Sequence, residues 1–85
     1  MRLLLLGTQG CHLCDDAKTL LDENEIVAEI IDIAIYEKWQ AQFALMIPVL
    51  FHVESQRFLN WHFDSPALLH FIETLNYDES IIESN

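Results

Sequence analysis

The chain has 85 residues, 52% of them hydrophobic, and its 4 Lys+Arg against 14 Asp+Glu give a formal net charge of −10. This length suits one small domain and is too short for two. The negative charge repels nucleic-acid phosphates and anionic lipid surfaces, so we expect neither nucleic acid nor a membrane among the partners.

The amino terminus, Met1-Arg2 followed by leucines, resembles a secretory signal peptide only in part. Its apolar run stops at Gly7, before the ~7 to 15 residues that such a signal needs, and no segment is long enough to span a bilayer. We therefore expect a cytoplasmic protein. In that compartment a close pair of cysteines is more often catalytic or metal-binding than a structural disulfide.

The first third of the chain predicts a strand, a helix and a second strand. Leu3 to Leu6 is a continuous apolar run, typical of a strand covered on both faces. After a turn, apolar residues recur at helical spacing and predict a helix from about Cys11 to Asn24. Ile26 to Ile33 is apolar and β-branched, which favours a strand. Such a unit implies parallel strands joined by a right-handed crossover.

The middle of the chain predicts a second helix and a hairpin. Ile35 to Leu45 carries aromatic residues on one side and polar residues on the other, which predicts the helix. Ile47 to Val53 predicts a third strand, opened by Pro48. A polar turn follows, and Phe58 to Phe63 predicts an edge strand that pairs with the third.

The carboxy-terminal part predicts one more helix. Ser65 is expected to cap it, with Pro66 at its first position, and its apolar periodicity ends near Asn76. We therefore expect one domain over residues 1–76 and an acidic tail over residues 77–85.

The two cysteines of the chain, Cys11 and Cys14, are separated by two residues at the turn between the first predicted strand and helix. The free N–H groups and the dipole of a helix N-terminus favour an anion, and a thiolate is one. The pattern predicts thiol-disulfide exchange, in which the more exposed Cys11 attacks a target disulfide and Cys14 then closes an internal one.

Charged residues next to the pair act in opposite directions. His12, when protonated, would favour the Cys11 thiolate, and it is equally well explained as a solvated turn residue. Asp15 and Asp16 suit the helix dipole but would oppose a neighbouring thiolate. The sequence does not decide which effect is larger.

Two other interpretations use the same cysteines. In the first, the pair is half of a zinc site, although the remaining histidines form no second close pair of ligands. These histidines are His12, His52, His62 and His70. We expect no metal ion. In the second, the cysteines are incidental to a scaffold that serves only to contact other proteins.

The summed order, strand-helix-strand-helix-strand-strand-helix, predicts an α/β fold with a four-stranded mixed sheet. This order and four motifs resemble the glutaredoxin family, in particular the short glutaredoxin-like redoxins of bacteria, over about Arg2 to Leu75. The motifs are Gly10-Cys11-His12-Leu13-Cys14-Asp15, Asp32-Ile33, Ile47-Pro48-Val49-Leu50 and Trp61-His62-Phe63-Asp64. The resemblance implies a three-layer thioredoxin-like fold and a small dithiol oxidoreductase. We expect it to act on protein or low-molecular-weight disulfides, with a disulfide-containing protein as its partner.

The resemblance also implies roles for residues outside the cysteine motif. In the family, the proline that opens the third strand is cis and faces the cysteines, which assigns this role to Pro48. The backbone of Ile47 would then pair with an extended substrate. An ordinary proline at a strand start would need no substrate.

The chain departs from the glutathione-using members of the family at two positions. Thr8-Gln9 replaces their basic residue before the cysteines, and Asn60-Trp61-His62-Phe63 replaces their glycine pair, with Asp64 as the candidate for the acidic residue that follows. Because glutathione carries two carboxylates, the negative charge of the chain disfavours it. We expect no cofactor, an unidentified thiol reductant and a monomer.

Overall fold

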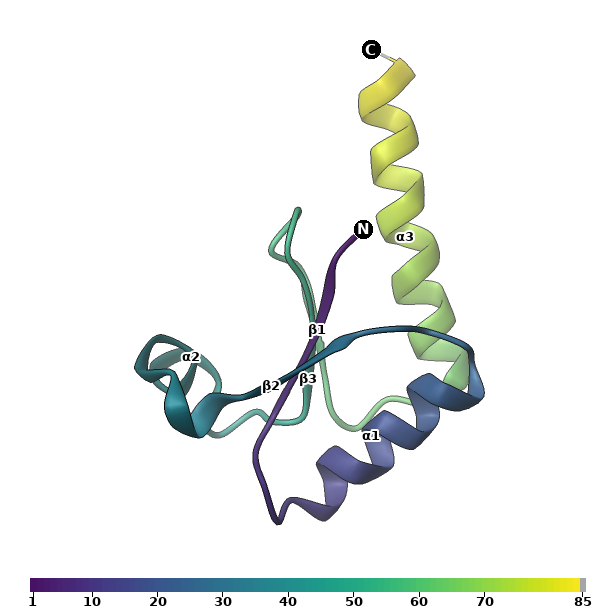
Figure 1. Ribbon diagram of the computed structural model, residues 1–85. Helices are drawn as coiled ribbons and strands as arrows, with labels where there is room; N and C mark the ends of the chain where they lie inside the picture. Colours follow the sequence, from purple (N-terminus) through teal and green to yellow (C-terminus); the bar gives the residue numbers. More distant parts are fainter. Residues whose placement is uncertain (85) are drawn as a thin grey trace.

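The computed structural model describes the backbone of residues 1–84 and the side chains of residues 1–75 (Figure 1). The elements follow the predicted order, with a short 3-10 helix added after the second strand. They are β1 (Leu3–Gly7), α1 (His12–Glu23), β2 (Glu29–Asp32), η1 (Ile33–Ile35), α2 (Glu37–Phe43), β3 (Val49–His52), β4 (Phe58–Asn60) and α3 (Ser65–Ser84). None of the described helices is long and apolar enough to cross a membrane.

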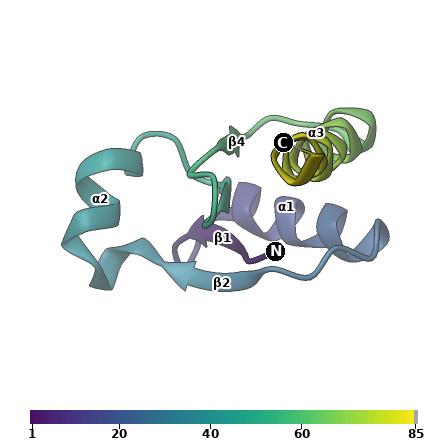
Figure 2. The same cartoon turned by 90° about the horizontal axis from the view of Figure 1, so that it is seen from above.

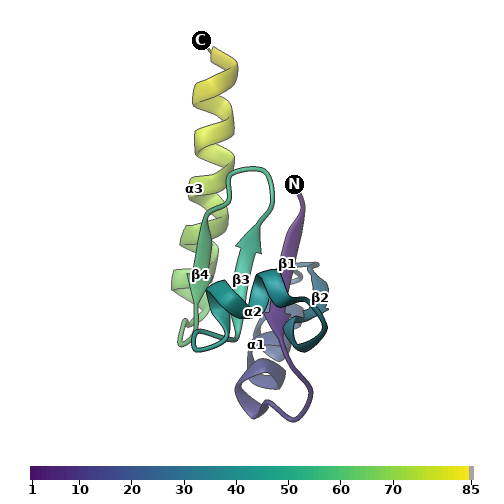
Figure 3. The same cartoon turned by 90° about the vertical axis from the view of Figure 1, so that its left-hand side faces the viewer.

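The four strands form one mixed sheet in the order β2-β1-β3-β4 (Figure 3). β1 runs parallel to β2 and antiparallel to β3, and β3 pairs antiparallel with β4. This confirms the parallel unit and the hairpin. β4 lies at an edge as predicted, but it ends at Asn60 rather than at Phe63. Because β1 has a neighbour on each side, the turn that follows Gly7 is held at the centre of one sheet end.

Helices cover both faces of the sheet. Viewed along the sheet, α1 and α3 lie on one side and α2 on the other (Figure 2). Leu3 and Leu5 pack with α1 and α3, whereas Leu4 and Leu6 pack with the buried Phe43 of α2. Burial of each such leucine contributes ~1.5–3 kcal/mol, so a strand buried on both faces needs an unbroken apolar run. The predicted three-layer α/β fold is confirmed.

The second strand is shorter than predicted at both ends, and a side-chain cap accompanies its end. β2 begins at Glu29 rather than Ile26 and ends at Asp32. The Asp32 carboxylate accepts a hydrogen bond from the Ala34 N–H at 2.9 Å and caps η1. An aspartate that offers this local bond competes with the sheet ladder. α2, at Glu37–Phe43, is likewise shorter than the predicted helix.

The last helix differs from the prediction at both ends. Asp64, not Ser65, caps it, because the Asp64 Oδ1 accepts from the Ala67 N–H at 3.0 Å. Ser65 Oγ instead accepts from Asn24 Nδ2 at 3.1 Å. The backbone of α3 continues to Ser84, so the predicted end near residue 76 is wrong.

No glycine or proline follows Pro66 to stop this helix. An acidic tail over residues 77–85 stays a prediction, because their side chains, and residue 85 altogether, lie outside the described part of the chain.

Candidate active site

The cysteine pair lies where β1 turns into α1. Residues 8–11 connect the end of β1 at Gly7 to the start of α1 at His12, at the bottom of Figure 1. Gly10 has a φ of +78°, a conformation that costs an L side chain energy and glycine none. The tight turn therefore depends on glycine directly before Cys11.

Cys11 is the N-cap residue of α1. Its backbone is extended, with φ −93° and ψ 106°, and its Sγ accepts a hydrogen bond from the Cys14 N–H at 3.1 Å. Its carbonyl oxygen accepts from the Asp15 N–H at 3.2 Å. The first-turn N–H that a capping serine would satisfy is thus directed at a sulfur, and it would favour negative charge there.

Cys11 and Cys14 form a disulfide, and their Cα atoms are 5.2 Å apart. This separation lies within the ~4.4–6.8 Å range of ordinary disulfides. Both residues are half-buried, so the bond is neither sealed inside the core nor fully exposed. The two sulfurs are therefore placed to form the internal disulfide that the cysteine spacing predicts.

Cys14 is directed back toward the sheet, against Gly7. A Cβ atom placed on Gly7 would lie 2.8 Å from Cys14 Sγ and 3.2 Å from Cys14 Cβ. Gly7 therefore leaves the space that the second sulfur occupies. In the sequence Gly7 marks only the end of the apolar run, and a glycine in the last position of a buried strand is a sign of such a close approach.

A cavity of about 310 Å³ opens beside Cys14, between α1 and β2. The apolar side chains of Leu5 and Ile30 form part of its wall, and Ile31 borders it from the next position of β2. Its other lining residues are Gly7, Thr8, Gln9, Cys14, Asp15, Lys18 and Asp32. A molecule approaching the disulfide from this side would meet apolar surface first and carboxylates at the rim.

Residues 2–73 match the model of the glutaredoxin-like domain family (DUF836). The chain belongs to this family. The match includes both cysteines, the turn before them and all four strands. The predicted family relationship is therefore confirmed, and the disulfide occupies the domain's strand-to-helix turn.

Two proteins of known structure resemble this glutaredoxin-like domain. The crystal structure of protein XcR50 from X. campestris is 29% identical, covers 85% of this chain and 96% of its own, and has a TM-score of 0.77. The solution structure of protein Ne2328 from Nitrosomonas europaea is 27% identical, covers 82% of this chain and 88% of its own, and has a TM-score of 0.65. No curated protein matched the chain.

The residue before the third strand of this glutaredoxin-like domain lies at the same sheet end as the cysteines. The Ile47-Pro48 peptide bond is cis, and Pro48 is fully buried. In the antiparallel ladder of β1 and β3, Val49 lies opposite Leu6, so the preceding Pro48 lies beside Gly7. Ile47 is half-buried and packs against the core under α2.

The remaining predicted site residues are divided between two surfaces. His12 is exposed at the first position of α1, beside the pair. Asp64 lies at the start of α3, where it lines a separate open groove with Asp16, Trp61 and His62. The cavity that contains Cys14 does not include Asp64. The substrate-binding role assigned to His12 and Asp64 stays a prediction.

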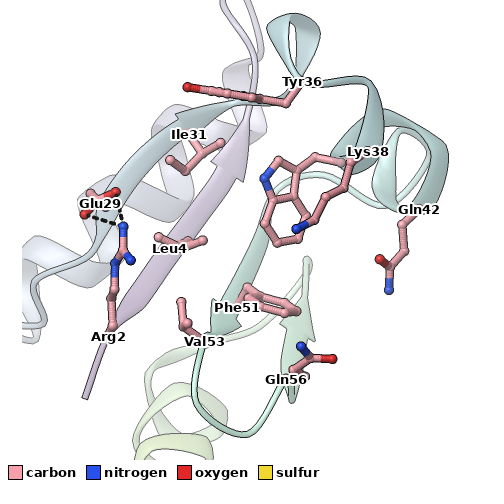
Figure 4. A pocket seen from close by; sticks show the side chains of 11 residues that line it. Arg2, Leu4, Glu29, Ile31, Tyr36, Lys38, Gln42, Phe51, Val53 and Gln56 are labelled. Carbon is pink, nitrogen blue, oxygen red and sulfur yellow. Dashed lines mark hydrogen bonds and ion pairs between the residues drawn. The ribbon is translucent and has the colours of Figure 1, made fainter.

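A larger cavity, of about 470 Å³, lies on the α2 face of the sheet (Figure 4). Its cations already have partners: Arg2 forms an ion pair with Glu29 at 3.2 Å, and Lys38 lies 5.0 Å from the ring centre of Trp39. Neither cysteine lines it, so its size does not make it the redox site.

The histidines do not gather around the cysteines. Within the described residues, no three His, Cys, Asp or Glu side chains are grouped to hold a metal ion. His52 is buried at the far end of β3, with Nδ1 2.7 Å from Ser55 Oγ. Its Nε2 lies 3.1 Å from Glu54 Oε1 but is not aligned for a hydrogen bond. His52 therefore belongs to the β3–β4 turn.

Proposed function

We propose that the protein is a small dithiol oxidoreductase that exchanges its Cys11–Cys14 pair with disulfides in other proteins. The observation that carries this proposal is the disulfide itself, half-buried at the N-terminus of α1, with the Cys14 N–H donating to Cys11 Sγ. The same N–H would stabilise a thiolate at Cys11 in the reduced protein. Membership of the glutaredoxin-like family supports the same reaction class.

In the reductive direction, the Cys11 thiolate attacks one sulfur of a substrate disulfide. A Cys11–substrate disulfide forms, and the other substrate sulfur leaves as a thiolate that takes a proton from water. Cys14, deprotonated, then attacks Cys11 Sγ, the internal disulfide forms, and the second substrate thiol is released. Two electrons pass to the substrate, and a separate thiol reductant must return two to regenerate the dithiol.

Cys11 is the attacking residue in this proposal, because the two sulfurs have different surroundings. Cys11 Sγ accepts the first-turn N–H, which stabilises a thiolate, whereas Cys14 Sγ is directed toward Gly7 and the sheet. Pro48, at the level of Gly7, and the backbone of Ile47 would border the substrate chain on the β3 side of the pair. The β2 side is bordered by the cavity beside Cys14.

The test combines a redox titration with insulin reduction by the protein in the presence of dithiothreitol. We expect one dithiol–disulfide transition in glutathione buffers and catalysed insulin reduction that Cys11→Ser abolishes. The matched variant Cys14→Ser keeps the attacking sulfur, so it should lose turnover yet retain a mixed disulfide visible by mass spectrometry. A Cys11→Ser variant as active as the wild type, or a pair that never oxidises, would reject the proposal in favour of a non-catalytic binding module.

A further inference from the structure

We infer that the cavity beside Cys14 receives a lysine or arginine side chain that adjoins the reacting cysteine of a protein substrate. This inference rests on the proposed function and assigns it a substrate class. It follows from where the cavity lies, from what lines it, and from the charge at its rim.

The cavity is within reach of a residue next to the substrate cysteine. In the mixed disulfide the substrate is bonded to Cys11, and the Cα of Cys14, whose side chain lines the cavity, is 5.2 Å from that of Cys11. Successive Cα atoms of the substrate are ~3.8 Å apart. A substrate chain that passes on the β2 side therefore places the neighbour of its cysteine over the cavity.

The wall and the rim of the cavity differ in chemistry. Leu5 and Ile30, which lie opposite each other in the β1–β2 ladder, form an apolar wall, and Ile30 keeps 56% of its surface exposed. Asp15 comes from the first turn of α1, and Asp32 from the end of β2 directly beside Gly7 in the sheet. Long cationic side chains bury an apolar stem and keep the charge near water, which matches this pairing of wall and rim.

The cation already present does not cancel the rim charge. Lys18 is the only Lys or Arg among the described residues that line the cavity, and its Nζ binds Asp22 Oδ2 at 3.0 Å. Asp15 and Asp32 therefore retain negative charge toward an incoming substrate. The hydrogen bond from the Ala34 N–H fixes the position of Asp32. An anionic disulfide such as oxidised glutathione would meet repulsion at the same place.

The experiment uses peptide disulfides in which both neighbours of the cysteine are Lys, Gln or Glu in an otherwise identical sequence. We would measure the rate constant for oxidation of the fully reduced protein by each peptide, and divide it by the rate with dithiothreitol to remove intrinsic reactivity. The Lys peptide should react about 2- to 5-fold faster than the Gln peptide, and the Glu peptide more slowly, with the spread reduced in ~0.5 M salt. A peptide with diaminopropionate, a cation with a shorter stem, should lose most of the advantage.

Variants locate the effect. Asp15→Asn and Asp32→Asn should each reduce the Lys-to-Glu rate ratio, and asparagine preserves the cap that Asp32 provides. Asp16→Asn is the matched control, because Asp16 is adjacent in sequence but lines the groove near Asp64 instead. Equal normalised rates for all peptides, or equal loss in the Asp16 variant, would overturn the inference and leave the oxidoreductase function standing. A reduced protein that reacts with no disulfide would reject both.

Discussion

The contact between Gly7 and Cys14 gives a sharp test of how the sheet sets the properties of the disulfide. In Gly7→Ala the new Cβ would lie 2.8 Å from Cys14 Sγ, whereas ordinary van der Waals contacts begin at 3.4 Å. The sulfur or the strand must therefore move by about 0.6 Å, the difference between the two distances. Overpacking of this kind typically costs ~1–3 kcal/mol.

The cost should fall mainly on the oxidised state. There the sulfur is bonded to Cys11 and Cys14 cannot rotate away, whereas the free thiol in the reduced state can. A difference of ~1–3 kcal/mol between the two states shifts the potential of a two-electron couple by ~20–65 mV, toward a stronger oxidant. The disulfide of the variant should be reduced more readily.

The assay is a titration of both proteins in glutathione buffers, with the free energy of unfolding measured by urea for each redox state. Thr8→Ala is the control, because Thr8 lines the same cavity without filling the space behind Cys14. We expect a less negative potential and a larger loss of stability in the oxidised state for Gly7→Ala alone. An unchanged potential, with equal destabilisation of both states, would refute this account of Gly7.

Three further predictions concern stability. Asp64→Ala should lower the free energy of unfolding by ~1 kcal/mol through loss of the α3 cap, and Ser65→Ala should lower it by less. A larger loss for Ser65→Ala than for Asp64→Ala in urea denaturation would contradict the observed cap. Phe43→Ala should cost ~3–5 kcal/mol, because Phe43 is fully buried under α2; a loss below ~1 kcal/mol would show that this core collapses easily. The pKa of Glu54 is lowered from 4.5, chiefly by the Arg2 N–H that donates to its carboxylate. The stabilisation that the ionised Glu54 carboxylate gives to the fold is therefore complete above pH 4.5 and is lost as the pH falls through the lowered folded-state pKa. The stability advantage of the wild type over Glu54→Gln should shrink in acid. An advantage independent of pH would contradict the assignment.

The sequence predicted most of the fold because its strongest patterns are local. An apolar run such as Leu3–Leu6 has few alternatives to a strand buried on both faces, and the helical periodicity after Cys11 placed α1 to within a residue at each end. Two of the errors occurred where a polar side chain could hydrogen-bond the backbone in more than one way. Asp64 rather than Ser65 caps α3, and Asp32 ends β2 by capping η1.

The disulfide could be predicted, but its surroundings could not. Two cysteines one helical turn apart meet by local geometry alone. The space that Gly7 leaves for Cys14 depends on how α1 packs on β1, and the Asp32 carboxylate reaches the cavity only because β2 pairs with β1 in one register. A glycine that ends a buried strand indicates a close approach, but packing between the elements decides which side chain approaches it.

The edges of the sheet bear on how the protein behaves when concentrated. The outer strands are short, with four residues in β2 and three in β4, and β2 carries a carboxylate at each end, in Glu29 and Asp32. An exposed strand edge offers unpaired backbone groups to another molecule, and short length and charge both discourage such growth. A chain that is half apolar thereby presents little template for β-aggregation, and replacing those carboxylates with valine should promote fibrils.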